Sequence, residues 1–345
     1  MKLDTDIKLD FNDVLIRPKR SECSSRNDID LTREFTFKYS KLTWKGIPII
    51  SSNMDTISTI DMCKSLSTSN LITCFHKYID VEQIIQNKLN PDSFMLSTGI
   101  TENNYETLCQ NMSLLQENKI INKFICIDVA NGYMAKLIDF CKKVRARFPE
   151  QIIVAGNVVT RELVEELILN GKVDIVKIGI GSGAVCTTRL QTGVGMPQFS
   201  SIIECADAAH GLGGHIISDG GICYPGDISK AFGSGADFVM MGSMFAGHEE
   251  CEGEIEWIAG KRHKVFYGMS SEQAMTKFNG GVANYRSSEG KCVKVEYKGK
   301  VQDTINNFLG GIRSTCTYVG AKKLKDLSKC CTFMQVNRQV NTFYS

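Results

Sequence analysis

Short runs of apolar residues alternate along the chain with segments in which apolar residues recur at helical spacing. The runs are nearly continuous and rich in Ile, Val and Phe, which is typical of parallel strands that are buried on both faces. Eight such runs predict eight strands: "IPIISS" from Ile47, "LITCFH" from Leu71, "FMLSTG" from Phe94, "FICIDVA" from Phe124, "IIVAGNV" from Ile152, "DIVKIGI" from Asp174, "HIISDGG" from His215 and "FVMMGS" from Phe238.

Helical patterns such as "YMAKLIDFCKKVRARF" and "RELVEELILNG" lie between the runs. In the second, Leu163, Leu167 and Ile168 share one face, and Gly171 is a typical helix stop signal. Eight strand–helix units predict an α/β protein with a (β/α)8 barrel, the TIM-barrel fold. A doubly wound sheet would need a GxGxxG motif after the first strand, and "SSNMDT" stands there instead.

The alternation fails after Ser243. Residues 261–300 are polar and rich in Gly and Lys, which predicts a hairpin-like lid over the mouth of the barrel. A helical pattern resumes in residues 301–345. We therefore expect a single domain over residues 1–345, with a lid at about 261–300 and a helical tail at about 301–345.

Composition and charge exclude some classes of function. The chain has 345 residues, 43% of them apolar, and a net charge of +2, which favours neither a nucleic-acid-binding nor a membrane-binding surface. No apolar run approaches the roughly 20 residues of a membrane span. The start "MKLDTDIKLDFND" is polar and acidic, unlike a signal or transit peptide, and we expect a cytoplasmic protein.

The 14 cysteines form no CxxC pair and no Cys/His zinc pattern. Cys330 and Cys331 are adjacent, which is a poor arrangement for a structural disulfide. We interpret the cysteines as reduced thiols of a cytosolic chain. Their number therefore gives no reason to single out any one of them.

Polar residues collect where the predicted strands end. In a (β/α)8 barrel these ends share one face, and active sites are built there. The residues concerned are Asn53, Asp55, His76, Lys77, Asp128, Asn131, Asn157, Asp219, Gly242 and Ser243, together with the stretch from Gly181 to Cys186.

The stretch "GIGSGAVCTTRLQTGVG" follows the sixth strand and contains Cys186. Its glycines allow sharp turns, and Thr187, Thr188 and Arg189 place hydroxyls and a positive charge near the thiol. A neighbouring cation favours the thiolate, which is the nucleophilic form. The loop by itself is compatible with a catalytic nucleophile and with an ordinary loop cysteine.

Two glycine-containing loops follow the seventh and eighth strands, "SDGGICYPGD" and "MMGSMF". Loops at these positions form the recurrent phosphate site of this fold, and a carboxylate such as Asp219 suits ribose hydroxyls. Either loop alone could be a tight turn, but the two in succession favour a nucleoside monophosphate. The lid stretch "NYRSSEGK" carries charges that are equally typical of a solvated loop.

Five motifs in order, "GSGAVCTTR", "SDGG", "MMGSMF", "FYGMSS" and "YRSSEGK", resemble the IMP dehydrogenase/GMP reductase family. The resemblance runs from "LDFNDVLIRPKR" to "GGIRSTCTYVGAKKL". Within the family the chain is similar to the reductases, because only "KYIDVEQIIQNKLNPDS" separates strands two and three. That leaves no room for the regulatory module of typical IMP dehydrogenases.

The resemblance implies the reaction GMP + NADPH + H⁺ → IMP + NADP⁺ + NH₃, with a thioimidate on Cys186 and a proton relay through Thr188 and Glu289. The acidic Glu289 favours deamination over the water activation that dehydrogenases carry out with an Arg–Tyr pair. Two alternatives remain: an IMP dehydrogenase without its regulatory module, and a nucleotide-binding assembly protein that has lost turnover.

The resemblance also implies ligand contacts. GMP would be bound by Asp219, Gly220, Gly221, Gly242, Ser243, Gly268, Met269, Ser270, Arg286 and Gly290. NADPH would be bound, partly from a neighbouring subunit of a homotetramer, by Ser25, Arg26, Lys77, Asp128, Val129, Ala130, Ile180, Gly181, Tyr285, Ser314, Thr315, Cys316 and Thr317. A potassium ion would be held by the backbone carbonyls of Gly181, Gly183, Cys186 and Arg189.

Two residues depart from the family pattern. Ala184 stands where relatives usually carry a serine that reaches the phosphate, and Ser182 stands where many reductases have proline. We expect weaker GMP binding, by on the order of 1 kcal/mol for one missing hydrogen bond. We also expect a less constrained loop around Ser182.

Overall fold

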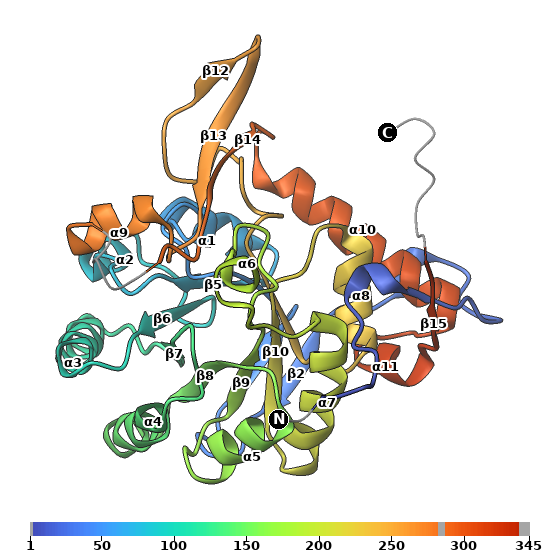
Figure 1. Ribbon diagram of the computed structural model, residues 1–345, viewed down its shortest axis with the longest axis horizontal. Helices are drawn as coiled ribbons and strands as arrows, with labels where there is room; N and C mark the ends of the chain where they lie inside the picture. The colour runs from blue at the N-terminus through green and yellow to red at the C-terminus, as the bar shows by residue number, and fades with distance from the viewer. Residues whose placement is uncertain (1–2, 282–286, 338–345) are drawn as a thin grey trace.

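The computed structural model describes residues 3–281 and 287–337. Within them, eight parallel strands close into a barrel in the order β10–β11–β4–β5–β6–β7–β8–β9 (Figure 1). The predicted fold and all eight predicted strands are confirmed: β4 (Ile49–Ser51), β5 (Ile72–Phe75), β6 (Phe94–Thr98), β7 (Phe124–Asp128), β8 (Ile152–Val158), β9 (Ile175–Ile178), β10 (His215–Asp219) and β11 (Phe238–Met241).

Helices surround the barrel and shield the outer face of its strands (Figure 1). Side-chain caps start several of them: Thr59 accepts a hydrogen bond from the Met62 N–H, and Thr101 accepts one from Asn104. The helices are α1 (Ile60–Thr68), α2 (Val81–Gln86), α3 (Glu102–Glu117), α4 (Ala135–Arg147), α5 (Arg161–Leu169), α7 (Gln198–Gly211), α8 (Pro225–Gly233) and α10 (Val301–Val319).

A hairpin that the sequence pattern did not predict closes the bottom of the barrel. Strands β2 (Arg33–Thr36) and β3 (Thr43–Gly46) pair antiparallel. The rings of Phe35 and Trp44 pack against Phe124 and Phe238, the first residues of β7 and β11. The hairpin therefore blocks the amino-terminal end of the barrel, and the opposite end forms the mouth.

Segments from both ends of the chain meet on the outside of the barrel. Strand β1 (Val14–Ile16) pairs antiparallel with β15 (Phe333–Gln335). Short helical turns complete this region: η1 (Phe11–Asp13), η2 (Arg26–Asp28), η3 (Leu324–Asp326) and α11 (Leu327–Cys330). The helix η2 packs against α10.

The lid lies between β11 and α10. In the part that the structure describes, it contains an antiparallel sheet of β12 (Glu256–Ile258), β13 (Lys261–Tyr267) and β14 (Cys292–Glu296), with α9 (Glu272–Asn279) between β13 and β14. The sheet projects from the barrel (Figure 1) and begins ahead of the predicted residue 261. The lid is thus an insertion between the last barrel strand and its helix.

All 14 cysteines lie in the described ranges, and all are free thiols. Across residues 3–281 and 287–337, no helix has the length and apolar character needed to cross a membrane.

Candidate active site

Three neighbouring strands supply the loops of the mouth. Strand β10 pairs with β9 on one side and with β11 on the other. The Cys186 loop, the turn after Asp219 and the turn at Gly242 and Ser243 therefore lie side by side. Gly220 has a φ of +89°, and a Cβ there would lie 2.6 Å from the Ser182 Oγ, so this close approach requires glycine.

The structure brings the three predicted catalytic residues into one hydrogen-bonded line. The Cys186 Sγ donates to the Thr188 Oγ1 at 3.2 Å, and the Thr188 hydroxyl donates to the Glu289 Oε2 at 2.7 Å. A hydroxyl both donates and accepts, so it can pass a proton between the carboxylate and the neighbourhood of the thiol. Cys186 is partly exposed and therefore accessible to a substrate in the mouth.

Backbone hydrogen bonds hold Glu289 against the Cys186 loop. The Thr187 N–H donates to the Glu289 carbonyl at 2.9 Å, and the Lys291 N–H donates to the Val185 carbonyl at 2.9 Å. Cys186 and Gly290 form an antiparallel β-bridge between these two bonds. The lid segment is thus docked on the loop, and the position of the carboxylate follows from the backbone on both sides of it.

A buried lysine joins two carboxylates at the mouth. Lys177, on β9, is 3% exposed, and its Nζ lies 2.5 Å from the Asp128 Oδ1 and 2.9 Å from the Asp219 Oδ2. Asn53 donates to the other oxygen of Asp128 at 3.0 Å, and Asn157 donates to Asp219 at 2.9 Å. Every one of these donors therefore stabilises the ionised form of a carboxylate.

In this cluster Lys177 and Asp128 each favour the charged form of the other. Burial alone would lower the pKa of Lys177, but Asp128 and Asp219 raise this pKa well above its ordinary value. Burial likewise opposes ionisation of Asp128, yet the Lys177 ammonium holds the pKa of Asp128 below its usual range. At neutral pH Lys177 therefore carries a positive charge and Asp128 a negative one, and the oxygens of Asp128 and Asp219 can accept hydrogen bonds from a ligand.

A cavity of about 170 Å³ opens beside the cluster. Residues predicted to bind cofactor and residues predicted to bind substrate line it together: Lys77, Asp128 and Ala130 from the first group, and Met269 and Ser270 from the second. Asn53, His76, Tyr78, Ser97, Thr98 and Met275 complete its walls. The mouth therefore offers one space in which two ligands could meet.

Comparison with known proteins identifies the family. Residues 8–341 match the IMP dehydrogenase / GMP reductase domain. The chain belongs to this family. It is 56% identical to human GMP reductase 2 over 99% of this chain and 98% of that protein. It is 54% identical to human GMP reductase 1 over 100% and 99% of the two chains, and 53% identical to GMP reductase of Klebsiella pneumoniae over the same shares.

The cofactor-binding residues inferred from the family fall into two groups in the structure. Lys77 follows β5, Asp128 ends β7 with Val129 and Ala130 after it, and Ile180 and Gly181 follow β9, all at the mouth. Ser25, Arg26 and the residues from Ser314 to Thr317 lie on η2 and α10 instead. Thr315 lines a separate groove of about 330 Å³ that includes none of the mouth residues. Cys316 is fully buried, so its side chain cannot touch a ligand there.

Some of the residues predicted to bind ligands lie outside the described ranges. Others lie in loops at the mouth, where contacts between the loops fix their position. Tyr285 and Arg286 belong to residues 282–286 and are not among those that the structure describes. Ser243 donates to the Ile222 carbonyl at 3.2 Å, which ties the turn after β11 to the turn after β10. Gly268, Met269 and Ser270 directly follow β13, and Gly290 bridges to Ser271.

The predicted potassium ligands are backbone carbonyls. The Gly183 carbonyl accepts a hydrogen bond from the Cys186 N–H at 3.0 Å, and the Arg189 carbonyl accepts one from Gly193 at 3.2 Å. Each of these two oxygens keeps a second lone pair that could face an ion. Among the described side chains, no group of three or more His, Cys, Asp or Glu residues could hold a metal ion.

The two departures from the family pattern lie on the Cys186 loop. Ser182 donates its hydroxyl to the Asp219 carbonyl at 2.9 Å, a bond that ties this loop to the next and acts against the looser loop we expected. Ala184 is exposed and carries no polar side-chain atom. The Arg189 guanidinium anchors the far side of the loop through Asp10 at 3.0 Å and the Met196 carbonyl at 2.8 Å.

Sequence reasoning missed Lys177. The signal was present, because "DIVKIGI" contains a lysine in a strand that is otherwise apolar. A charge in a strand that is buried on both faces requires a partner. The partners lie on other strands, so the run itself could not identify them.

Proposed function

We propose that this protein catalyses the NADPH-dependent reductive deamination of GMP to IMP with release of ammonia. The hydrogen-bonded line from Cys186 through Thr188 to Glu289 is the observation that carries the proposal. It combines a nucleophile with a carboxylate that can take up a proton through Thr188 and return it to the departing amine, and displacement of an amine requires both groups. The relatives named GMP reductase, similar over nearly the whole chain, support the same reaction.

In the proposed mechanism, the Cys186 thiolate adds to C2 of the GMP purine and forms a C–S bond. The amine at C2 leaves as ammonia after it has gained a proton, and a thioimidate remains on Cys186. NADPH, when bound, would supply the hydride that reduces C2 and would become NADP⁺. The C–S bond then breaks, which releases IMP and regenerates the Cys186 thiolate.

Thr188 and Glu289 are assigned to the proton transfer. A neutral amine is a poor leaving group, so a proton must arrive as the C–N bond breaks. Glu289 would carry the proton, and Thr188 would relay it because its hydroxyl contacts both Glu289 and Cys186. The later transfer of hydride does not need that proton.

The loops at the mouth would hold the nucleotide. Gly220, Gly221, Gly242 and Ser243 would bind the phosphate, and Asp219 would accept hydrogen bonds from the ribose hydroxyls. Lys77, Asp128 and Ala130 would bind the nicotinamide half of NADPH, because they share a cavity with Met269 and Ser270. Carbonyls of the Cys186 loop would bind potassium and fix the backbone around the thiol.

Two alternatives are less well supported. An IMP dehydrogenase would have to activate water, and Glu289 beside Thr188 suits protonation of an amine better. A nucleotide-binding protein without turnover would have no need to keep the thiol, the hydroxyl and the carboxylate in hydrogen-bond contact.

The test is a steady-state assay of the purified protein with GMP and NADPH, and separately with IMP and NAD⁺. We expect the NADPH absorbance to fall in the first mixture, with one ammonia released for each NADPH consumed. Cys186→Ala should abolish this turnover and leave GMP binding largely intact, because the thiol acts on C2 and not on the phosphate. Turnover of IMP with NAD⁺ alone would instead favour the dehydrogenase.

We further propose a homotetramer in the cytoplasm. Ser25 and Arg26 lie at η2, and Thr315 lies on α10 in a groove separate from the mouth, and these positions support contributions from a neighbouring subunit. The cytoplasmic location rests on the composition and on the free cysteines.

A further inference from the structure

The lid contacts the barrel at a second place, away from Cys186. Asp55, in the loop after β4, accepts a hydrogen bond from the Tyr267 hydroxyl at 2.6 Å and from the Lys277 Nζ at 3.0 Å, both on its Oδ2. Its own N–H points to the Met269 Sδ at 3.5 Å. Tyr267 ends β13 and Lys277 belongs to α9, so one barrel carboxylate holds two elements of the lid.

Asp55 is costly to bury and therefore depends on these donors. The residue is 4% exposed, and among the described residues its Oδ1 has no hydrogen-bond partner. A buried carboxylate is stabilised only by the groups that donate to it or carry the opposite charge. Movement of the lid away from Asp55 would remove both donors at once, so the carboxylate favours the docked position.

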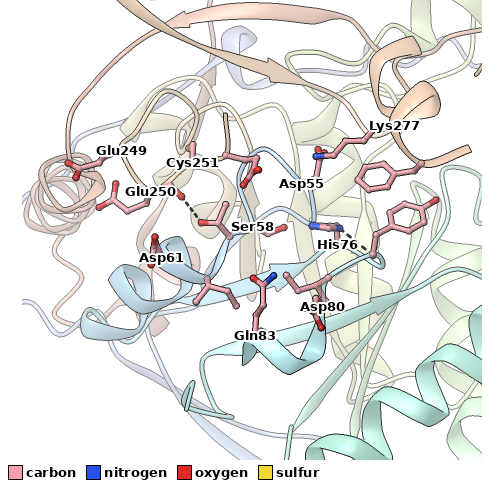
Figure 2. A pocket seen from close by; sticks show the side chains of 16 residues that line it. Asp55, Ser58, Asp61, His76, Asp80, Gln83, Glu249, Glu250, Cys251 and Lys277 are labelled. Carbon is pink, nitrogen blue, oxygen red and sulfur yellow. Dashed lines mark hydrogen bonds and ion pairs between the residues drawn. The ribbon is translucent and has the colours of Figure 1, made fainter. Parts of the chain in front are cut away.

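Packing alone fixes α9 only in part. On one side, Phe278 stacks on Tyr78 with ring centroids 4.2 Å apart. A cavity of about 420 Å³ opens beside this contact, and Figure 2 shows Asp55 and Lys277 next to each other at its edge, with His76 also lining it. The helix buries Ala274 and Met275 as well, and on the side that borders the cavity the polar contacts with Asp55 add to this packing.

The same lid segment positions Glu289. The Ser271 N–H bonds to the Gly268 carbonyl at 3.0 Å, which forms a tight turn directly after Tyr267. The Glu289 N–H then donates to the Ser270 carbonyl at 3.2 Å, and Ser271 forms a β-bridge with Gly290. A continuous set of contacts thus leads from Asp55 through residues 267–271 to the backbone of Glu289.

We propose that Asp55 is a positioning residue for the reaction: its carboxylate, through Tyr267 and Lys277, seats the lid so that Glu289 reaches Thr188. The proposal rests on the proposed function, because it assigns Asp55 to the step in which Glu289 acts. Asp55 itself does not contact Cys186 or Thr188 in this arrangement. Its effect should therefore appear only where Glu289 is needed.

The test variant is Tyr267→Phe, which removes one hydroxyl and keeps the ring that packs in the lid. Asp55→Asn is the second variant, since it keeps the shape and removes the charge that attracts Lys277. In single turnovers with GMP alone, we expect ammonia release to slow about tenfold in both, the usual scale for one hydrogen bond to a charged group. Hydride transfer from IMP to NADP⁺ should stay within about twofold of the parent protein.

A matched control and a double variant make the result specific. Lys294→Met removes an ion pair with Glu256 that lies within the lid sheet and does not reach the barrel, so both half-reactions should be unchanged. Tyr267→Phe added to Glu289→Gln should slow ammonia release little further, because the positioned group is already absent.

Two outcomes would overturn the proposal. Equal losses in both half-reactions would show that Tyr267 and Asp55 act only on general stability. In the double variant, the loss in the rate of ammonia release could also equal the product of the losses in the two single variants. That result would show that Asp55 does not act through Glu289. Failure of the proposed function would be distinguishable from these two outcomes, because the parent protein itself would then release no ammonia from GMP.

Discussion

At the scale of single residues, one lysine organises the charges of the mouth. Lys177 is nearly inaccessible and bridges Asp128 and Asp219, which are assigned to the cofactor and to the ribose. It is the shared partner of two neighbouring carboxyl groups, and it favours the ionised form of the buried Asp128. Without it, burial would raise the pKa of Asp128 and favour its protonated form.

We predict that Lys177→Met weakens both ligand sites and destabilises the fold. Breaking a buried ion pair costs about 3 kcal/mol or more, which urea unfolding would measure as a lower midpoint. The pKa of Asp128 would rise, because burial would then act without the opposing ammonium. The acid limb of the pH profile of kcat/KM for NADPH should therefore move to higher pH. An unmoved acid limb would remove Asp128 from cofactor binding.

Substitution of the loop residue Ala184 is expected to strengthen GMP binding. Ala184→Ser would restore a hydroxyl donor at the position that family members use for the phosphate. We expect GMP to bind more tightly by roughly 0.5–1.5 kcal/mol, the net worth of one hydrogen bond. Calorimetric titration of the parent and the variant with GMP measures the difference. Equal or weaker affinity of the serine variant would contradict the assignment.

At the scale of elements, the strands were predictable and the contacts between loops were not. Burial on both faces forces nearly every strand position to be apolar, so the eight runs are visible in the sequence. The hairpin of β2 and β3 has short strands of mixed polarity, "REFT" and "TWKG", which give no such pattern. Thr188 and Glu289 are 101 positions apart, so their contact depends on the docked lid.

The lower end of the barrel contains an ionic cluster with a defined pH response. Asp237 accepts hydrogen bonds from His210 at 2.8 Å and from Arg33 at 3.2 Å. The bond to Asp237 raises the pKa of His210 above its ordinary value of 6.5, although burial acts in the opposite direction. The stability that this bond contributes is thus fully present below about pH 6.5 and is lost as the pH rises through the pKa of the folded state.

We therefore predict that His210→Gln changes the pH dependence of stability on the alkaline side. The free energy of unfolding of the parent should fall, relative to the variant, as the pH rises above about 6.5. Urea midpoints of both proteins across this range give the difference, and titrating groups that do not contact Asp237 cancel; His215, whose Nδ1 lies 3.4 Å from the same Asp237 oxygen, stays in both proteins. Parallel curves would show that the hydrogen bond between His210 and Asp237 contributes no pH-dependent stability.

At the scale of the whole molecule, the cofactor site assigned from the family is divided between two surfaces. Asp128 and Lys77 lie at the mouth, whereas Arg26 and Thr315 lie on η2 and α10. In an oligomer, each complete site would combine the mouth of one subunit with the α10 surface of another.

Hybrid oligomers test this division. Cys186→Ala damages only the mouth, and Arg26→Ala damages only the outer surface formed by η2 and α10, where Arg26 on η2 is exposed. When the two variants are unfolded, mixed and refolded together, we expect activity above that of either one alone, because some sites pair an intact mouth with an intact Arg26. A mixture of Cys186→Ala with Thr188→Ala should gain nothing, since both lesions lie in the same mouth. Absence of any gain in the first mixture would place the whole site within one subunit.

The most direct measurement of the central claim is a single-turnover comparison of the parent with Glu289→Gln. Glutamine keeps the shape and the hydrogen bond to Thr188 but cannot supply the proton that the departing amine needs. We predict that ammonia release from GMP falls about 10²-fold or more, the usual scale of acid–base catalysis, while hydride transfer from IMP to NADP⁺ falls much less. Equal losses in the two half-reactions would contradict the account and would mean that Glu289 only organises the lid.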